Sequence, residues 1–330
     1  MAGSEAGDRR HRALRTIAFV LGGTSVASLL AWVFDLGSFA FWFRAVSVPG
    51  QVALIVGAVW LARRPDLVPV RTLLVAGVVG GLVGTLGYDL FRLPFVVAGL
   101  RVLAPIDSYG VLALDTATSS SLTGFVGWSY HVANGIGFGI AYAALAGTGR
   151  RWPWAIVWAL ALETTTVVTP FAERYALSGR WVPIAIAYAA HVPYGVALGV
   201  AVEHADAIAA ELRAVGRWSV PLLLGAVFTI LAAWHAPWQA TAPAEVEDAE
   251  PPTVVVRDQR FEPEWLRVEV GGCASVVNLD DAAYVLDRGE PAALPASATT
   301  RVCFDEPGVH RVHTVDQPYA GGFVIVDEHA

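Results

Sequence analysis

The stretch FDEPGVHRVHTVDQPYAGGFVIV, residues 304 to 326, decides the fold of the C-terminal part of this chain. It contains a Pro-Gly turn, a first strand, and a second strand that follows two glycines. A second stretch, FEPEWLRVEVGGCASVVNLD at 261 to 280, adds two further strands and another glycine turn. Short runs of apolar and polar residues bounded by Gly, Pro and Asp are typical of all-β domains. The two stretches predict a small all-β Greek-key sandwich over residues 253–330.

The order of these motifs resembles that of the cupredoxins, the blue-copper electron carriers, over about residues 253–326. The motifs are Phe-x-Pro, a strand, a Gly turn, Asn-x-Asp, Phe-x-x-Pro-Gly and two closing strands. The resemblance implies a copper site made of one His after Asn-x-Asp, and of Cys, His and Met from the last loop. Those positions hold Tyr284, Thr314, Gln317 and Ala320. We therefore expect the fold without the copper, and no cofactor in this domain.

Two histidines and two cysteines remain in this domain. His310 and His313 stand three apart in a predicted strand and so point to opposite faces, which does not make a chelate. In the cupredoxins, the strands that correspond to those of Cys273 and Cys303 are antiparallel neighbours. The resemblance therefore implies a disulfide between them, closing a loop of about 30 residues. Such a bond requires an oxidising compartment.

The composition of the whole chain indicates a membrane protein. Hydrophobic residues make up 55% and charged residues 15% of its 330 residues, whereas average soluble domains are about 25% charged. The mean hydropathy is +0.53. The net charge of −7 gives no indication of a nucleic-acid partner.

Apolar stretches long enough to cross a lipid bilayer predict a multi-span α-helical membrane bundle of about seven helices over residues 1–236. A Pro/Ala/Glu-rich linker at 237–252 is expected to be extended and solvated, and the β-sandwich follows it. Between the third and fourth spans, the partly apolar connection 93–123 includes a candidate re-entrant or interfacial segment. The predicted spans are 13–34, 47–62, 70–92, 124–146, 153–171, 181–202 and 218–236.

The distribution of arginine predicts the orientation of these spans, because cytoplasmic loops are enriched in basic residues. One set of alternate connections holds Arg9, Arg10, Arg12, Arg15, Arg63, Arg64, Arg71, Arg150, Arg151, Arg213 and Arg217. The other set holds Arg44, Arg92, Arg101, Arg174 and Arg180. We therefore expect a multi-pass protein of the cell membrane with a cytoplasmic N-terminus. Seven spans then place the C-terminal domain on the extracytoplasmic side, where the cysteines can pair.

Ionisable residues inside predicted spans are candidates for function, because they are costly in lipid. Asp89 and Arg92 stand three apart on one helical face. A local ion pair near the outer interface is one interpretation, and a substrate contact or gate is the other.

Two later spans share the pattern HVxxGxxxG, at His131 to Gly139 and at His191 to Gly199. The glycine spacing gives a flat face on which another helix lies close. Both histidines and Glu163 are expected at similar depth in the membrane. They are candidates for a metal or haem site or a proton relay, and hydrogen-bonded packing of helices is the structural alternative.

The sequence contains no ATP-binding loop, no His-Glu-x-x-His and no Gly-x-Ser-x-Gly. Nothing in it indicates an enzyme. The leading hypothesis is a membrane protein whose outward, copper-free cupredoxin-like domain serves as a binding or structural module. The alternative is redox, metal or haem handling, or transport, at His131, His191 and Glu163. Assembly with another membrane or extracytoplasmic protein is a further expectation.

Overall fold

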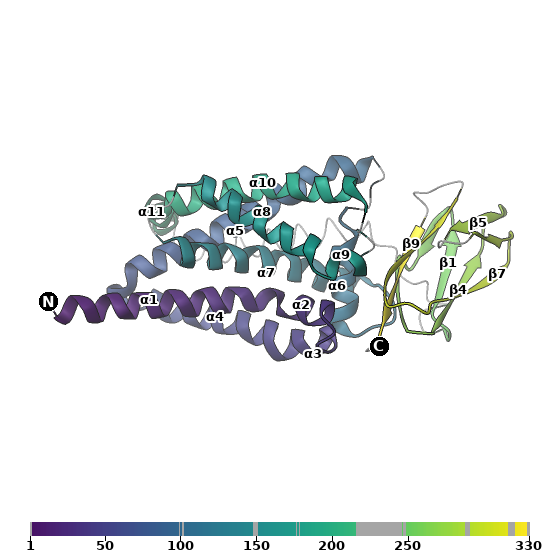
Figure 1. The fold of residues 1–330 in the computed structure, drawn as a ribbon, viewed down its shortest axis with the longest axis horizontal. Helices are drawn as coiled ribbons and strands as arrows, with labels where there is room; N and C mark the ends of the chain where they lie inside the picture. Colours follow the sequence, from purple (N-terminus) through teal and green to yellow (C-terminus); the bar gives the residue numbers. More distant parts are fainter. Residues whose placement is uncertain are drawn as a thin grey trace.

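The chain folds into a helical bundle with a β-domain at one end (Figure 1). The computed structural model describes residues 2–98, 100, 102–147, 151–175, 177, 179–215, 246, 249–287, 291–315 and 321–328. Long helices run along the long axis of the molecule, and the N-terminus lies at the end away from the β-domain. The helices are α1 (Ala2–Gly23), α2 (Ala27–Val33), α3 (Phe39–Trp42), α4 (Val48–Ala62), α5 (Val68–Val97), α6 (Ala104–Leu114), α7 (Ser121–Ala146), α8 (Pro153–Val168), α9 (Phe171–Arg174), α10 (Trp181–Glu203) and α11 (Ala205–Val215).

Several helices are long and apolar enough to span a membrane, which indicates a membrane protein. Within the described residues there are four of these, at Gly7–Val33, Phe39–Ala62, Pro65–Val97 and Trp181–Glu203, and Pro153–Val168 is a shorter apolar helix. The second is longer than the predicted 47–62, because a π-helical turn at Phe43–Ser47 joins α3 to α4. The predicted span 218–236 lies outside the described residues.

Helix α7 covers the predicted span 124–146, but it is less apolar than the other long helices. Buried residues run along its whole length, from Thr123 to Ala144. Its neighbours include α1, α5 and α6. Because most of its central side chains are buried against other helices, polar residues such as Asn134 are tolerated at its centre.

The glycines of the HVxxGxxxG pattern lie at helix crossings. A Cβ added at Gly139 would lie 2.3 Å from the carbonyl oxygen of Gly77 in α5. A Cβ at Gly199 would lie 2.3 Å from the carbonyl oxygen of Trp152, at the start of α8. These backbones approach more closely than any side chain allows, as small residues permit in membrane helices. The repeated pattern thus packs α7 on α5 and α10 on α8.

The connection between α5 and α7 lies at the β-domain end of the bundle. Helix α5 continues to Val97, beyond the predicted end at 92. Helix α6 packs on α7, and nine of its eleven residues are buried. The apolar character of Ala104–Leu114 within this connection therefore reflects burial inside the protein.

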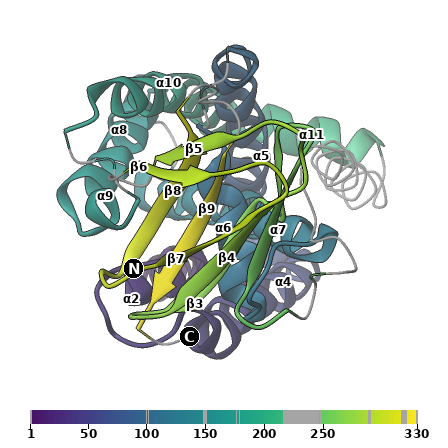
Figure 2. The same cartoon turned by 90° about the vertical axis from the view of Figure 1, so that its right-hand side faces the viewer.

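The β-domain contains two sheets, which Figure 2 shows in front of the helix ends. One sheet has the strand order β2-β1-β4-β7 and the other β3-β9-β8-β5-β6. Strand pairs β1–β4 and β3–β9 are parallel, and the remaining neighbours are antiparallel. The strands are β1 (Thr253–Arg257), β2 (Arg260–Glu262), β3 (Trp265–Glu269), β4 (Cys273–Asn278), β5 (Tyr284–Asp287), β6 (Pro291–Leu294), β7 (Thr299–Cys303), β8 (Gly308–Thr314) and β9 (Gly321–Asp327).

Strands β3 and β9 of the five-stranded sheet are buried on both faces. In β9, Val324 and Val326 belong to the core between the two sheets, whereas Phe323 and Ile325 pack into a core shared with the bundle. A strand covered on both faces has a continuous apolar sequence instead of an alternating one. This explains the run Phe-Val-Ile-Val at 323–326.

A short segment between α6 and α7 extends this sheet at its β3 edge. The amide of Arg267 donates to the carbonyl oxygen of Ala117 at 2.8 Å, and the amide of Ser119 donates to that of Trp265 at 3.0 Å. The hydroxyl of Ser119 accepts from the amide of Trp265 at 3.1 Å. The bundle and the β-domain are therefore joined by backbone hydrogen bonds as well as by side chains.

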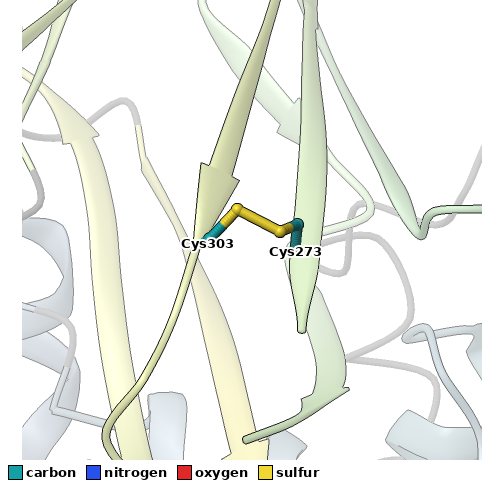
Figure 3. The surroundings of a disulfide bond; sticks show 2 residues. All are labelled: Cys273 and Cys303. Atoms are coloured by element: carbon teal, nitrogen blue, oxygen red, sulfur yellow. A yellow bond between two sulfur atoms is a disulfide. The ribbon is translucent and has the colours of Figure 1, made fainter. Parts of the chain in front are cut away.

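The two cysteines face each other in β4 and β7. Cys273 and Cys303 are directly paired in the antiparallel register, and their sulfur atoms are bonded (Figure 3). The bond joins two strands of the outer sheet, on the side away from the bundle.

Breaking this disulfide is expected to destabilise the β-domain. It closes a loop with a sequence separation of 30 residues, which corresponds to about 3 kcal/mol in the loop-entropy model. Hydrogen exchange of β4 and β7 in the full chain, with and without reductant, measures the loss. The double variant Cys273→Ser/Cys303→Ser should match the reduced protein. Equal protection in all three samples would contradict the prediction.

Candidate functional site

A cavity of about 360 Å³ lies inside the helical bundle at the end that faces the β-domain. Helices α5, α7, α8 and α10 provide many of its polar side chains, and α2 and α6 contribute apolar residues to its wall. Strands β3, β8 and β9 close it from the other side through Trp265, Val309, Arg311 and Phe323. A pocket of this size, largely apolar with a few polar groups, has the usual properties of a small-molecule site.

His131, the first histidine of the repeated pattern, pairs with a carboxylate of the neighbouring helix. Its Nε2 lies 3.0 Å and 3.2 Å from the two carboxylate oxygens of Asp89 in α5. The rings of Trp128 and Tyr88 flank its imidazole. His131 therefore contacts both a carboxylate and aromatic rings at the wall of the cavity.

His191 has a similar arrangement on the other side of the cavity. Its Nδ1 lies 2.8 Å from the carbonyl oxygen of Ala187 and 3.5 Å from Oε2 of Glu163 in α8. The ring of Tyr88 contacts the His191 imidazole edge to face, with 4.8 Å between centroids. The structure thus brings His131, His191 and Glu163 to the wall of one cavity.

The polar pair predicted within α5 does not form as a local ion pair. Asp89 directs its carboxylate to His131, and the guanidinium of Arg92 lies over the ring of Tyr88, 4.7 Å from its centroid. Residues three apart are neighbours on a helix, but the histidine of α7 offers Asp89 a partner across the helix crossing. Arg92 instead lines the cavity.

The cavity wall contributed by the β-domain was not predicted from the sequence. Trp265 is 1% exposed, and its ring stacks on Phe323 with 4.6 Å between centroids. Both residues come from the strands with apolar side chains on both faces. That absence of alternation was the signal in the sequence that this sheet has a second buried face.

Comparisons with solved structures match the β-domain. A reduced mutant of amicyanin is 21% identical with a TM-score of 0.23, and the match covers 26% of this chain and 90% of that chain. A purple cupredoxin from Nitrosopumilus maritimus is 17% identical with a TM-score of 0.21, and the match covers 23% of this chain and 98% of that chain. The C-terminal domain resembles the cupredoxins. No family model and no curated protein matches the chain.

The described copper positions of this cupredoxin-like domain do not fit copper. At the first histidine position, the hydroxyl of Tyr284 donates to Oδ2 of Asp280 at 2.8 Å. Thr314 is fully buried at the end of β8. Neither side chain supplies the imidazole or thiolate that copper requires. Gln317 and Ala320 lie outside the described residues.

Metal-ligand clusters are also missing from the part of the chain that the structure describes, where no three His, Cys, Asp or Glu side chains gather. At the cavity, His131 and His191 each face a separate carboxylate. His310 and His313 lie on opposite faces of β8, and Nε2 of His310 is 2.8 Å from the carbonyl oxygen of Glu306. The geometry of the described residues therefore gives more support to hydrogen-bonded pairs than to metal ligation.

Replacing Tyr284 by phenylalanine is expected to raise the pKa of Asp280. Partial burial of Asp280 alone would raise its pKa, but hydrogen bonds from the Gln259 amide, the Tyr284 hydroxyl and the Asp258 amide hold the pKa below 3.8. Because the pKa is lower in the folded state, these bonds stabilise the fold at pH values above the unfolded pKa. That stabilisation is lost as the pH falls through the folded pKa.

We expect Tyr284→Phe to cost about 1 kcal/mol at neutral pH. The difference from the unaltered protein should shrink as the pH falls through and below 3.8, the ordinary pKa of Asp280. Denaturant midpoints across this pH range measure the difference in stability between the two proteins. Asp280→Asn, which removes the titrating carboxyl, serves as the matched control. A difference between the two proteins that is independent of pH would contradict the assignment.

Proposed function

We propose that this chain is an integral membrane protein in which a copper-free, cupredoxin-like domain caps a ligand cavity in the helical bundle. The observation that carries the proposal is the position of Trp265. It belongs to a strand of the β-domain, yet it packs in the core of the bundle and forms part of the cavity wall. The β-domain is thus a structural part of the binding site.

The contacts between the two parts support a fixed cap. Besides the backbone bonds at residues 117–119, Arg267 of β3 reaches Asp115 at the end of α6, with 2.5 Å between Nη1 and Oδ1. At the same end of the bundle, Arg174 of α9 pairs with Asp35 and lies over the ring of Trp32. Gly308 of β8 lies against the backbone of Arg174. A network of this kind favours a permanent interface over a transient one.

We further propose a cytoplasmic N-terminus and an extracytoplasmic β-domain. The richer set of arginine connections is the support for this orientation, and the paired cysteines are consistent with an oxidising compartment. The N-terminus and the β-domain lie at opposite ends of the bundle (Figure 1), which is consistent with this orientation.

Metal analysis of the full chain tests the copper-free part of the proposal. Protein purified in lipid nanodiscs and exposed to Cu²⁺ should retain no stoichiometric copper after gel filtration. Retention of one copper per chain would overturn it.

Thiol labelling in sealed, right-side-out vesicles tests the orientation. A membrane-impermeant reductant followed by an impermeant maleimide should label Cys273 and Cys303 without permeabilisation. The variant Cys273→Ser/Cys303→Ser sets the background. Labelling that appears only after the vesicles are opened would place the domain on the other side.

The second candidate is a metal or haem function, supported by the three residues His131, His191 and Glu163 lining one cavity. An absorption spectrum of the detergent-solubilised chain tests for haem. Metal content before and after the double change His131→Ala/His191→Ala tests for a bound ion. A Soret band, or bound metal that is lost in the double variant, would favour this candidate. Neither result is expected if the β-domain caps a cavity for an organic ligand.

A further inference from the structure

Arg92 lines the cavity between helices α5, α7, α8 and α10. Among the described residues of these four helices, it is the one arginine at the cavity, and it forms no ion pair with a carboxylate. Asp89 faces His131 and Glu163 faces His191, so each acid has its own imidazole. Arg92 is only 7% exposed, and its Nε has no hydrogen-bond partner among the described residues. No carboxylate oxygen among the described residues lies within ion-pair distance of Arg92, and its charge reaches Glu163 only at longer range. A buried guanidinium without a direct ion-pair partner is costly, and a ligand anion would supply one.

Two further buried polar atoms at the same cavity wall lack partners in the described part of the chain. They are Oδ1 of Asn134 in α7 and Nε1 of Trp265 in β3. Asn134 is 8% exposed and Trp265 is 1% exposed, and both line the cavity. Buried polar atoms of native proteins are nearly always hydrogen-bonded. Nε of Arg92 and Nε1 of Trp265 are donors, and Oδ1 of Asn134 is an acceptor. Together they indicate a site for a polar group of a ligand.

Much of the remaining cavity wall is apolar, from residues such as Leu29, Val33, Phe138 and Ile186. Small inorganic anions would gain nothing from these side chains. An apolar chain in contact with them gains about 25 cal/mol for each Å² removed from water. The walls therefore favour an anion that carries a hydrocarbon body.

We propose that the cavity binds an acidic amphiphile, with its anionic head at Arg92 and Trp265 and its hydrocarbon chain along the apolar wall. The proposal rests on the capped cavity described under the proposed function and names its ligand class. Carboxylates pair with guanidinium through charge-assisted, bidentate hydrogen bonds. A protonated acid or an alcohol could donate to Asn134, but it would leave the charge of Arg92 unpaired.

Radiolabelled palmitate and the full chain in nanodiscs test the proposal. Palmitate should bind with one site per chain, and unlabelled hexadecyl phosphate should displace it. Hexadecanol, which has the same chain without the charge, should displace it at least tenfold less well. Equal displacement by hexadecanol, or the absence of saturable palmitate binding, would overturn the proposal. Comparing the two acids shows whether a carboxylate or a phosphate head is preferred.

Charge variants of Arg92 provide the second arm. Arg92→Gln should weaken palmitate binding at least tenfold, and Arg92→Lys should keep most of it. Arg44→Gln, which changes an exposed arginine that bonds the carbonyl oxygen of Leu114, is the matched control. Equal affinity in the Gln and Lys variants would overturn the role of the charge, and the Lys variant keeps the test valid if the Gln variant fails to fold.

Hydrogen exchange at the amides of Ser119 and Arg267, which donate across the junction, separates the ligand proposal from the cap proposal. If palmitate fails to bind while these amides stay protected, the ligand class is wrong and the cap stands. If the amides exchange freely in the unaltered protein, the cap itself is wrong.

Discussion

Replacing Trp265 by alanine is expected to release the β-domain from the bundle, at a cost of about 3–5 kcal/mol. The side chain is 1% exposed and lies in a core cluster with Trp32, Phe39 and Tyr109 of the bundle. Its removal would open a cavity in the layer that holds the two parts together. The surrounding strand is tied to residues 117–119, so the layer has little freedom to collapse into the space.

Hydrogen exchange at the amides of Ser119 and Arg267 measures this release, because both donate across the junction. Both amides should lose protection in Trp265→Ala, while strands β4 and β7 should keep theirs. Trp181→Ala is the matched control, since Trp181 is 75% exposed at the start of α10. Unchanged protection at the junction would show that Trp265 does not hold the cap.

Replacing Arg267 by methionine is expected to destabilise the β-domain by a similar amount, about 3–5 kcal/mol. The Arg267 guanidinium bonds Oδ2 of Asp327 at 2.9 Å and 3.2 Å, and Asp327 is 1% exposed. Removing the cation leaves a buried carboxylate without this counter-charge. Loss of the bond to Asp115, which is half exposed, should matter less.

Thermal unfolding in nanodiscs measures this loss of stability, and two further variants test its cause. The double variant Arg267→Met/Asp327→Asn should recover much of the loss, because it removes the uncompensated charge together with its partner. Asp115→Asn alone should cost at most about 1 kcal/mol, as exposed pairs do. A double variant no more stable than Arg267→Met would contradict the buried-charge explanation.

The sequence predicted the classes of structure well where local patterns are strong. Turn residues such as Pro307 and Gly308 and the Asn278-x-Asp280 motif indicated the cupredoxin-like domain, and apolar runs indicated the long helices. The spacing of apolar residues along a segment depends on which of its faces are buried, so it can be read from that segment alone.

The sequence could not predict which elements meet. Asp89 and Arg92 are three apart and read as a pair, yet the partner of Asp89 is His131, 42 residues away. The Glu163–His191 contact likewise depends on the packing of α8 against α10, which glycine at 195 and 199 permits. The sequence predicted a similar depth in the membrane for these groups, but their pairing depends on how the helices are rotated about their axes.

The lack of alternation at 323–326 indicates a second buried face, but it does not show that the helical bundle covers that face. Val309 and Phe323 read equally well as residues of an ordinary sandwich. Their packing into the bundle depends on the short segment 115–119, whose polar sequence gives no indication that it pairs with β3.

That pairing at β3 has a consequence for the β-domain as a separate protein. An unpaired edge strand offers open amide and carbonyl groups to any other chain, and here the loop before α7 occupies those groups through its bridge to Leu266. A fragment beginning at Thr253 would expose both this edge and the indole of Trp265, and would be prone to strand-to-strand self-association. The helical part of the chain therefore protects this edge of the sheet from pairing with strands of other chains.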